Sequence, residues 1–259
     1  MTFVADAHVH VYAVHDPGAL FRHAAHNLGR LATAAGGDAT RAVFLTERGD
    51  CRAFAELSSG RMRPAGCHVN STRDALALHL DCAEGALYLI AGRQMATRER
   101  LEVLALGLAE PLPDGLSLAE AVAAVQEAGA LAVIPWSPGK WLFERGRALA
   151  RLVDSADPER LLLADSSLRP RGTPEPGLFA RARAHGMRVI AGTDPLPLPG
   201  EERLVGSYAV VCHGDFDAEQ PASSARRLLC DAPVRAGRRR SLPSVLQRLV
   251  RLALSPRPR

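Results

Sequence analysis

Two histidines near the start of the chain stand one residue apart in a run that is otherwise apolar. Residues 6–12 read DAHVHVY, so that Asp6, His8 and His10 alternate with small or apolar residues. Side chains repeat every two residues along a β-strand, and both imidazoles would therefore face one side and could bind one ion. A lone histidine in such a strand is more often an ordinary buried residue. The pair favours a metal site over that alternative.

Further polar side chains follow later apolar runs, where the predicted strands end. They could complete a metal site, move protons or hold a charged substrate, or they could be polar only because loops follow. These residues are Glu47, Arg48, Arg93, Gln94, Trp136, Lys140, Asp165 and Asp194. Lys140 is the single lysine of the chain and lies between the only two tryptophans, which suits an anionic group but also fits an exposed loop. Asp165 could face the site or cap a helix.

Short apolar runs alternate with helical patterns along the chain. The helix at 117–128 is the clearest, because Ser117 and Glu120 form a capping box and Gly129 ends it. The alternation indicates a mostly parallel sheet with crossover helices. Strands are predicted at 3–11, 41–47, 86–92, 101–107, 131–136, 160–165 and 188–194, and the other helices near 17–35, 50–58, 144–153 and 176–185.

The number of strand and helix units, about seven or eight, favours a single closed (β/α) barrel, TIM-like or distorted and seven-stranded, over a doubly wound sheet. In such a barrel the residues at the strand ends gather on one rim. The chain has 259 residues, of which 47% are hydrophobic, and this is enough for one sizeable core. We expect the barrel to occupy residues 1–225 and a basic extension to occupy residues 226–259.

The extension carries ten arginines against one aspartate and contains one amphipathic pattern. We predict a helix that packs its apolar side on the barrel, while Arg248 and Arg251 point the other way. An anionic membrane surface or a nucleic acid are the competing partners, and nucleic acid is not favoured. The apolar side consists of Val245, Leu246, Leu249, Leu252 and Ala253.

The sequence also limits location and cysteine chemistry. No run approaches the roughly 18 apolar residues that span a bilayer, and the first residues lack the pattern of a signal peptide, so a cytoplasmic location is expected. Nucleotide-binding loops and serine-hydrolase motifs are absent from the sequence. The odd number of cysteines, none paired as C-x-x-C, predicts reduced thiols at Cys51, Cys67, Cys82, Cys212 and Cys230.

An Asp-x-His-x-His motif that opens a barrel, with Gly-Thr-Asp at 192–194, resembles the amidohydrolase and the polymerase-and-histidinol-phosphatase (PHP) superfamilies. The second is the closer match and extends over roughly residues 3–196. RAVFLTER at 41–48 resembles the PHP strand that ends in Thr-Asp-His, LYLIAGRQMAT at 87–97 its Gly-x-Glu segment, and GALAVIPWSPG at 129–139 its His-Pro segment. This resemblance implies a distorted barrel and a metal-dependent hydrolase.

The departures from the PHP pattern concern its metal ligands. Arg48, Gln94, Leu104, Ser137 and Leu196 stand where that family has histidine or glutamate. A cluster of two or three metals cannot form as it does in the family. We therefore expect one divalent ion, zinc, manganese or iron, and its ligands would be His8, His10, Asp194 and Gln94.

The resemblance and the residues together lead to a functional hypothesis. The chain would be a metal-dependent hydrolase of a phosphoester or another small anionic substrate, with Asp194 or Glu47 as proton acceptor and Lys140 as a clamp on the anion. The alternative is a non-catalytic PHP-like barrel that serves as a binding or assembly module, as in the PHP-like subunit of ribonuclease P, which binds RNA. The residues expected to contact substrate are Arg48, Arg93, Trp136, Lys140 and Asp165.

Overall fold

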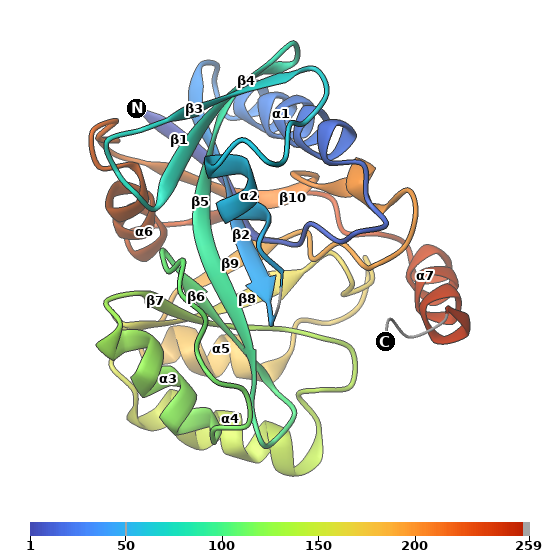
Figure 1. Cartoon of the computed structure of the whole chain (residues 1–259). Helices are drawn as coiled ribbons and strands as arrows, with labels where there is room; N and C mark the ends of the chain where they lie inside the picture. The colour runs from blue at the N-terminus through green and yellow to red at the C-terminus, as the bar shows by residue number, and fades with distance from the viewer. Residues whose placement is uncertain (50, 256–259) are drawn as a thin grey trace.

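The computed structural model describes residues 1–49 and 51–255. Its strands form a barrel-shaped sheet that nearly closes, with helices packed outside it (Figure 1). The strands are β1 (Thr2–Val9), β2 (Ala39–Arg48), β3 (Cys67–Ser71), β4 (Ala77–Cys82), β5 (Gly85–Ala96), β6 (Glu102–Leu106), β7 (Leu131–Pro135), β8 (Leu161–Ser166), β9 (Val189–Gly192), β10 (Tyr208–His213) and β11 (Val234–Gly237). The α-helices are α1 (Pro17–Ala34), α2 (Ala53–Ser58), α3 (Leu118–Glu127), α4 (Phe143–Ser155), α5 (Gly177–Ala184), α6 (Pro221–Cys230) and α7 (Leu242–Leu254), and a 3-10 helix, η1, covers Glu201–Leu204.

The expected single α/β barrel is confirmed, but its sheet is mixed, not mostly parallel. The main path runs β11-β10-β1-β2-β5-β6-β7-β8-β9. β1, β2 and β5 are parallel, as are β7, β8 and β9, whereas β6 is antiparallel to both of its neighbours and β10 to β1. The chain turns from β5 into β6 through a short loop, which permits only an antiparallel pair. The hairpin of β3 and β4, together with β10 and β11, was not predicted.

The barrel nearly closes where β9 comes against β1. The Asp194 amide donates a hydrogen bond of 2.9 Å to the carbonyl of His8. A Cβ atom at Gly192 would lie 2.4 Å from the Cβ of His8, so only glycine permits this approach. Inside the barrel, Phe3, Phe44 and Ile90 belong to one buried apolar cluster, and separate clusters lie under α1 and under the helices α3 to α5.

The expected division between residues 225 and 226 falls inside α6. This helix is continuous from Pro221 to Cys230, and β11 after it pairs with β10 and so extends the barrel sheet. The part of the chain that leaves the sheet therefore begins after Gly237. Within it, α7 lies at the edge of the molecule (Figure 1).

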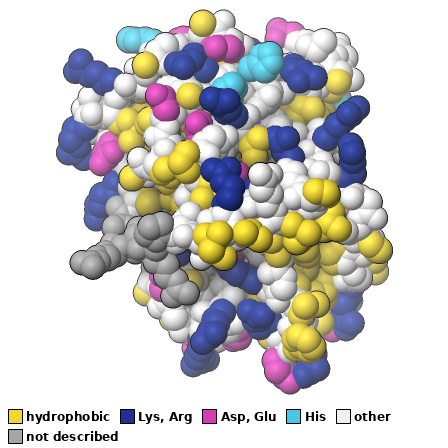
Figure 2. Space-filling model, turned by 90° about the vertical axis from the view of Figure 1, so that its right-hand side faces the viewer, with side chains coloured by type: hydrophobic (Ala, Val, Ile, Leu, Met, Phe, Trp, Pro, Cys, Tyr) yellow, Lys and Arg dark blue, Asp and Glu magenta, His cyan; other side chains and the backbone are white. Residues whose placement is uncertain are grey.

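α7 docks on the barrel through only part of the apolar side that the helical pattern indicated. Val245 is buried and Leu252 packs against the cluster of Leu168, Leu196 and Leu198, but Leu246 is 52% exposed. Leu242, Leu246, Val250 and Leu254 recur every four residues and stay exposed. Figure 2 shows an apolar band across this face of the molecule.

Arg248 was expected to face solvent, and the structure buries it. Its guanidinium donates to the Glu201 carboxylate, with Nε 2.8 Å from Oε1, and both side chains are nearly inaccessible. The same carboxylate accepts the amide of Leu196 at 3.1 Å. A buried carboxylate requires such partners, and this requirement outweighs the helical pattern that placed Arg248 outside.

Two further expectations can be compared with the structure. A disulfide joins Cys67 and Cys82, which are direct cross-strand partners in β3 and β4, so the prediction that all five cysteines are reduced is wrong for these two. The prediction of thiols is confirmed for the other three cysteines, Cys51, Cys212 and Cys230. No helix of the described residues is long and apolar enough to cross a membrane.

The Glu201–Arg248 pair gives a test of how α7 is held. Arg248→Gln should lower the free energy of unfolding by about 3 kcal/mol, because it leaves a buried carboxylate without its charged partner. Arg251→Gln, one turn further along α7 and exposed, should change it by less than about 0.5 kcal/mol. Urea unfolding followed by circular dichroism measures both. Equal effects of the two substitutions would contradict this docking.

Candidate metal centre

An irregularity in β1 directs both histidines into the barrel. The pairing of β1 with β2 shifts register between Asp6 and Val9. Ala7 belongs to the interior cluster and Val9 to the cluster under α1. The extra residue of the bulge interrupts the alternation of side chains along the strand. His8 and His10 therefore face the barrel interior, as Ala7 does before the bulge. Both histidines are buried.

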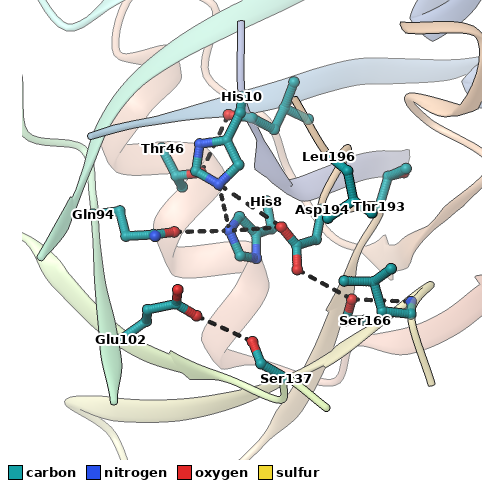
Figure 3. A network of polar contacts seen from close by, with 12 residues as sticks. His8, His10, Thr46, Gln94, Glu102, Ser137, Ser166, Thr193, Asp194 and Leu196 are labelled. Carbon is teal, nitrogen blue, oxygen red and sulfur yellow. Dashed lines mark hydrogen bonds and ion pairs between the residues drawn. The ribbon is translucent and has the colours of Figure 1, made fainter. Parts of the chain in front are cut away.

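Four potential ligand atoms converge at this point (Figure 3). Nε2 of His8 lies 3.0 Å from Nε2 of His10 and 3.0 Å from Oε1 of Gln94. Oδ1 of Asp194 lies 3.6 Å from the first of these nitrogens and 3.8 Å from the second. The expected ligands therefore meet in one place: His8 comes from β1, His10 directly follows it, Gln94 lies in β5 and Asp194 follows β9.

The carboxylate of Asp6 holds Asp194 in position. It accepts the amides of His8 (3.2 Å), Thr193 (2.8 Å) and Gly206 (2.8 Å), and the hydroxyl of Thr193. These bonds connect β1 with the segment that follows β9. The next residue, Asp194, has a φ of 53°, which is an uncommon backbone conformation for a residue other than glycine.

Burial sets the charge states of the cluster. Burial, together with the neighbouring His8, lowers the pKa of His10 well below its usual range, so this imidazole is neutral and has a lone pair to offer. Burial raises the pKa of Asp194, and it raises the pKa of Asp6 to about 6 against the hydrogen bonds that Asp6 accepts. A pKa of about 6 leaves Asp6 mostly ionised at neutral pH.

The donor set fits a divalent ion. Neutral imidazole nitrogens with carboxylate and amide oxygens suit zinc, manganese or iron. Ligand atoms of His8, His10 and Asp194 all lie within 4.8 Å of one another. Their lone pairs face one another in a buried space, where a cation would satisfy them together.

Glu102, at the start of β6, is a site residue that sequence reasoning missed. Its carboxylate accepts Ser137 Oγ at 3.0 Å and Lys140 Nζ at 2.6 Å, and Figure 3 shows it beside the cluster. Burial opposes ionisation, but Lys140 lowers the pKa of Glu102 below its ordinary range. The signal in the sequence was an acid directly before a run of apolar strand residues, together with the single lysine.

Glu47 and Arg93, expected to accept a proton and to bind substrate, are turned away from the cluster. They are cross-strand partners in β2 and β5 and form a buried ion pair with a distance of 2.9 Å between Arg93 Nη1 and Glu47 Oε2. Glu47 also accepts the amide of Phe54 at 2.8 Å and thereby fixes the start of α2. Because side chains alternate along a strand, Gln94 faces the barrel interior and Arg93 faces the other side.

The other residues expected to contact substrate do not lie together. Arg48 is exposed at the end of β2, close enough to His10 to act on its charge. Trp136 is half-buried against two apolar clusters. Asp165 accepts Tyr208 Oη at 2.7 Å and Arg169 Nε at 2.7 Å, in a buried network apart from the metal centre. Lys140 is bound to Glu102 beside the site, and its charge also acts on Asp194.

No protein-family profile and no curated protein sequence matches this chain. Solved structures do. PsfC from Pseudomonas syringae PB-5123 has a TM-score of 0.63 at 17% identity, covering 98% of this chain and 99% of its own. The lesion-specific endonuclease PfuEndoQ from Pyrococcus furiosus has a TM-score of 0.55 at 12% identity, covering 91% and 57%. Endonuclease Q in complex with a 27-mer duplex bearing an abasic lesion has a TM-score of 0.51 at 10% identity, covering 91% and 58%.

These identities establish the fold alone. The chain spans about 57% of the length of PfuEndoQ and nearly the whole of PsfC. The barrel that the PHP resemblance implied thus has solved counterparts, among them a lesion-specific endonuclease.

The Asp6 carboxylate gives a second test. Asp6→Asn should lower the free energy of unfolding by about 3 kcal/mol, because an amide offers one acceptor oxygen where two are used and leaves buried donors unpaired. Asp38→Asn, at an exposed position, serves as the control and should have almost no effect. Thermal and urea unfolding of both variants measure the difference. A stability of Asp6→Asn equal to that of the control would refute the role given to Asp6.

Proposed function

We propose that this chain is a metal-dependent hydrolase that uses one divalent ion to cleave a phosphoester or another small anionic substrate. The observation that carries the proposal is the convergence of the ligand atoms of His8, His10, Gln94 and Asp194 in a buried site beside an ionised glutamate. An acid, an amide and two imidazoles at this spacing are the donor types that bind such an ion, which supports a ligand set over ordinary packing.

One ion, not a cluster, is supported by what occupies the other PHP ligand positions. Leu104 and Leu196 are buried apolar side chains and offer no ligand atom. Ser137 is engaged with Glu102, and Gln94 supplies a neutral oxygen that cannot balance two cations. Among the described residues, His8, His10 and Asp194 form the group of histidines and acids that could hold an ion.

A divalent ion bound there would supply Lewis-acid chemistry, polarising the scissile group and lowering the pKa of a coordinated water. Glu102 is placed to accept the proton of the attacking water, since Lys140 keeps it ionised. It takes the role that the sequence suggested for Glu47. Lys140, held by Glu102, and Arg48 at the end of β2 supply positive charge for the anionic substrate.

The second candidate is a non-catalytic barrel that serves as a binding or assembly module. The observation in its favour is the loss of charged ligands at Leu104, Leu196 and Gln94. The endonuclease neighbours support the first candidate, because PfuEndoQ is a lesion-specific endonuclease, an enzyme that breaks a phosphoester bond. The two candidates differ in whether Glu102 accepts a proton during hydrolysis.

Metal content tests the site. Protein purified in buffer containing manganese or zinc and then dialysed should retain close to one ion per chain, and His8→Ala, His10→Ala or Asp194→Ala should each reduce this to near zero, since each removes a ligand. His26→Ala, on the exposed side of α1, is the matched control and should retain the ion. Elemental analysis gives the ratio. Wild-type protein that comes out free of metal would remove the basis of the hydrolase proposal.

Turnover separates the two candidates. Glu102→Gln should lower kcat for bis(p-nitrophenyl) phosphate by about 100-fold or more while the metal content stays the same, because the amide cannot accept a proton. Glu99→Gln in the loop before β6 is the control. Hydrolysis that is unaffected by Glu102→Gln would exclude it as the proton acceptor. Metal-loaded protein with no turnover on phosphate esters would favour the non-catalytic module.

A further inference from the structure

A groove of about 830 Å³ runs along the seam where the barrel sheet begins and ends. β9 and β11 are the two terminal strands of the main path, and residues next to both line the groove. Half of the lining residues are arginines. Arg169 and Arg171 follow β8, Arg183 and Arg188 lie in and after α5, and the others are Arg235, Arg238 and Arg239.

The two walls of the groove are tied together. The Arg171 amide donates to the carbonyl of Arg240 at 2.7 Å, and a guanidinium nitrogen of Arg239 donates to the carbonyl of Pro170 at 3.2 Å. Arg169 and Arg235 bind the same buried carboxylate, that of Asp165. The segment after β8 and the segment from β11 to α7 therefore form one fixed surface.

The charges of the groove are only partly balanced. Asp165 pairs with Arg169 and Arg235, and Glu175 pairs with Arg183 and Arg235. The side chains of Arg171 and Arg238 are exposed and make no hydrogen bond or ion pair with the described residues. The groove thus presents free guanidinium groups held close together by paired ones, an arrangement that attracts a ligand with several negative charges.

The chemistry of the lining selects phosphate among the possible anions. Guanidinium groups bind phosphate oxygens in pairs, and a row of them fits a row of phosphates. Tyr208, the aromatic residue in the lining, is 5% exposed and its hydroxyl is bound to Asp165, so that no ring is presented for stacking on a base. Contacts to phosphate without contacts to bases give binding that is independent of sequence.

We propose that this groove is a second binding site, distinct from the metal centre, for a chain of phosphate groups such as the backbone of a nucleic acid. The two sites lie on opposite sides of the end of β8. Asp165 faces the groove network, while the hydroxyl of the next residue, Ser166, donates to Asp194 Oδ2 at 3.4 Å. The proposal does not depend on hydrolysis, and its test can be made without a metal.

The test compares two double variants with equal loss of charge. Arg171→Gln with Arg238→Gln removes the two unpaired guanidinium groups of the groove. Arg61→Gln with Arg151→Gln removes two exposed arginines elsewhere. Binding of a fluorescein-labelled DNA duplex of about 20 base pairs, and of inorganic tripolyphosphate, is measured in EDTA at several salt concentrations. Thermal unfolding of each variant verifies that it is folded.

For the duplex, the groove variant should bind about fivefold or more weakly than the wild type, and the slope of log K against log salt should become shallower by about two. The control variant should change both far less. If the protein does not bind DNA but binds tripolyphosphate, and this binding depends on Arg171 and Arg238 in the same way, the groove is a site for a free oligophosphate. Failure to bind either probe, or equal losses in both variants, would overturn the proposal, whatever the metal content proves to be.

Discussion

The carboxylate of Asp6 is the interaction on which both the barrel and its site depend. It is fully buried and accepts four hydrogen bonds, from the first strand and from the segments after β9 and η1. Closing the barrel and placing Asp194 beside the histidines are therefore one event. A buried charge of this kind is tolerated only when its acceptor sites are filled, so the bonds that satisfy Asp6 also specify a unique arrangement of the chain around it.

That His8 and His10 lie side by side could be predicted from the sequence, because the rule that places them is local. Side chains two apart in a strand share a face, and this places His8 beside His10 wherever the strand lies. Which face of the sheet the two histidines take could not be predicted. Strict alternation from Phe3, which faces the interior, would have placed His8 and His10 on the outer face. The bulge between Asp6 and Val9 reverses this, and it arises from pairing with β2 and not from the composition of β1.

The same alternation explains why Glu47 and Arg93 turn away from the histidines at the ends of β2 and β5. Glu47 and Arg48 are neighbours, as are Arg93 and Gln94, and only one residue of each pair can face the interior. The register pairs Glu47 with Arg93, whose side chains lie on the outer face of the sheet. It pairs Gln94, on the inner face, with Arg48 at the exposed end of β2. Glu102, Asp165 and Arg248 found partners far away in the sequence, and a single chain without its fold contains no rule that predicts such pairs. The antiparallel β6 and the hairpin of β3 and β4 were missed for a similar reason, since strand direction depends on loops.

The Glu201–Arg248 pair connects the C-terminal helix to the loop that carries Asp194, because the same carboxylate holds the amide of Leu196. His8 lies in the first strand and His10 directly after it, whereas Arg248 lies in α7. Because synthesis runs from the N-terminus to the C-terminus, both histidines are made before Asp194 and before α7. The segment that carries Asp194 is thus supported from the last helix, and a chain that stopped before α7 would contain Asp194 without the Glu201–Arg248 pair that holds the neighbouring Leu196.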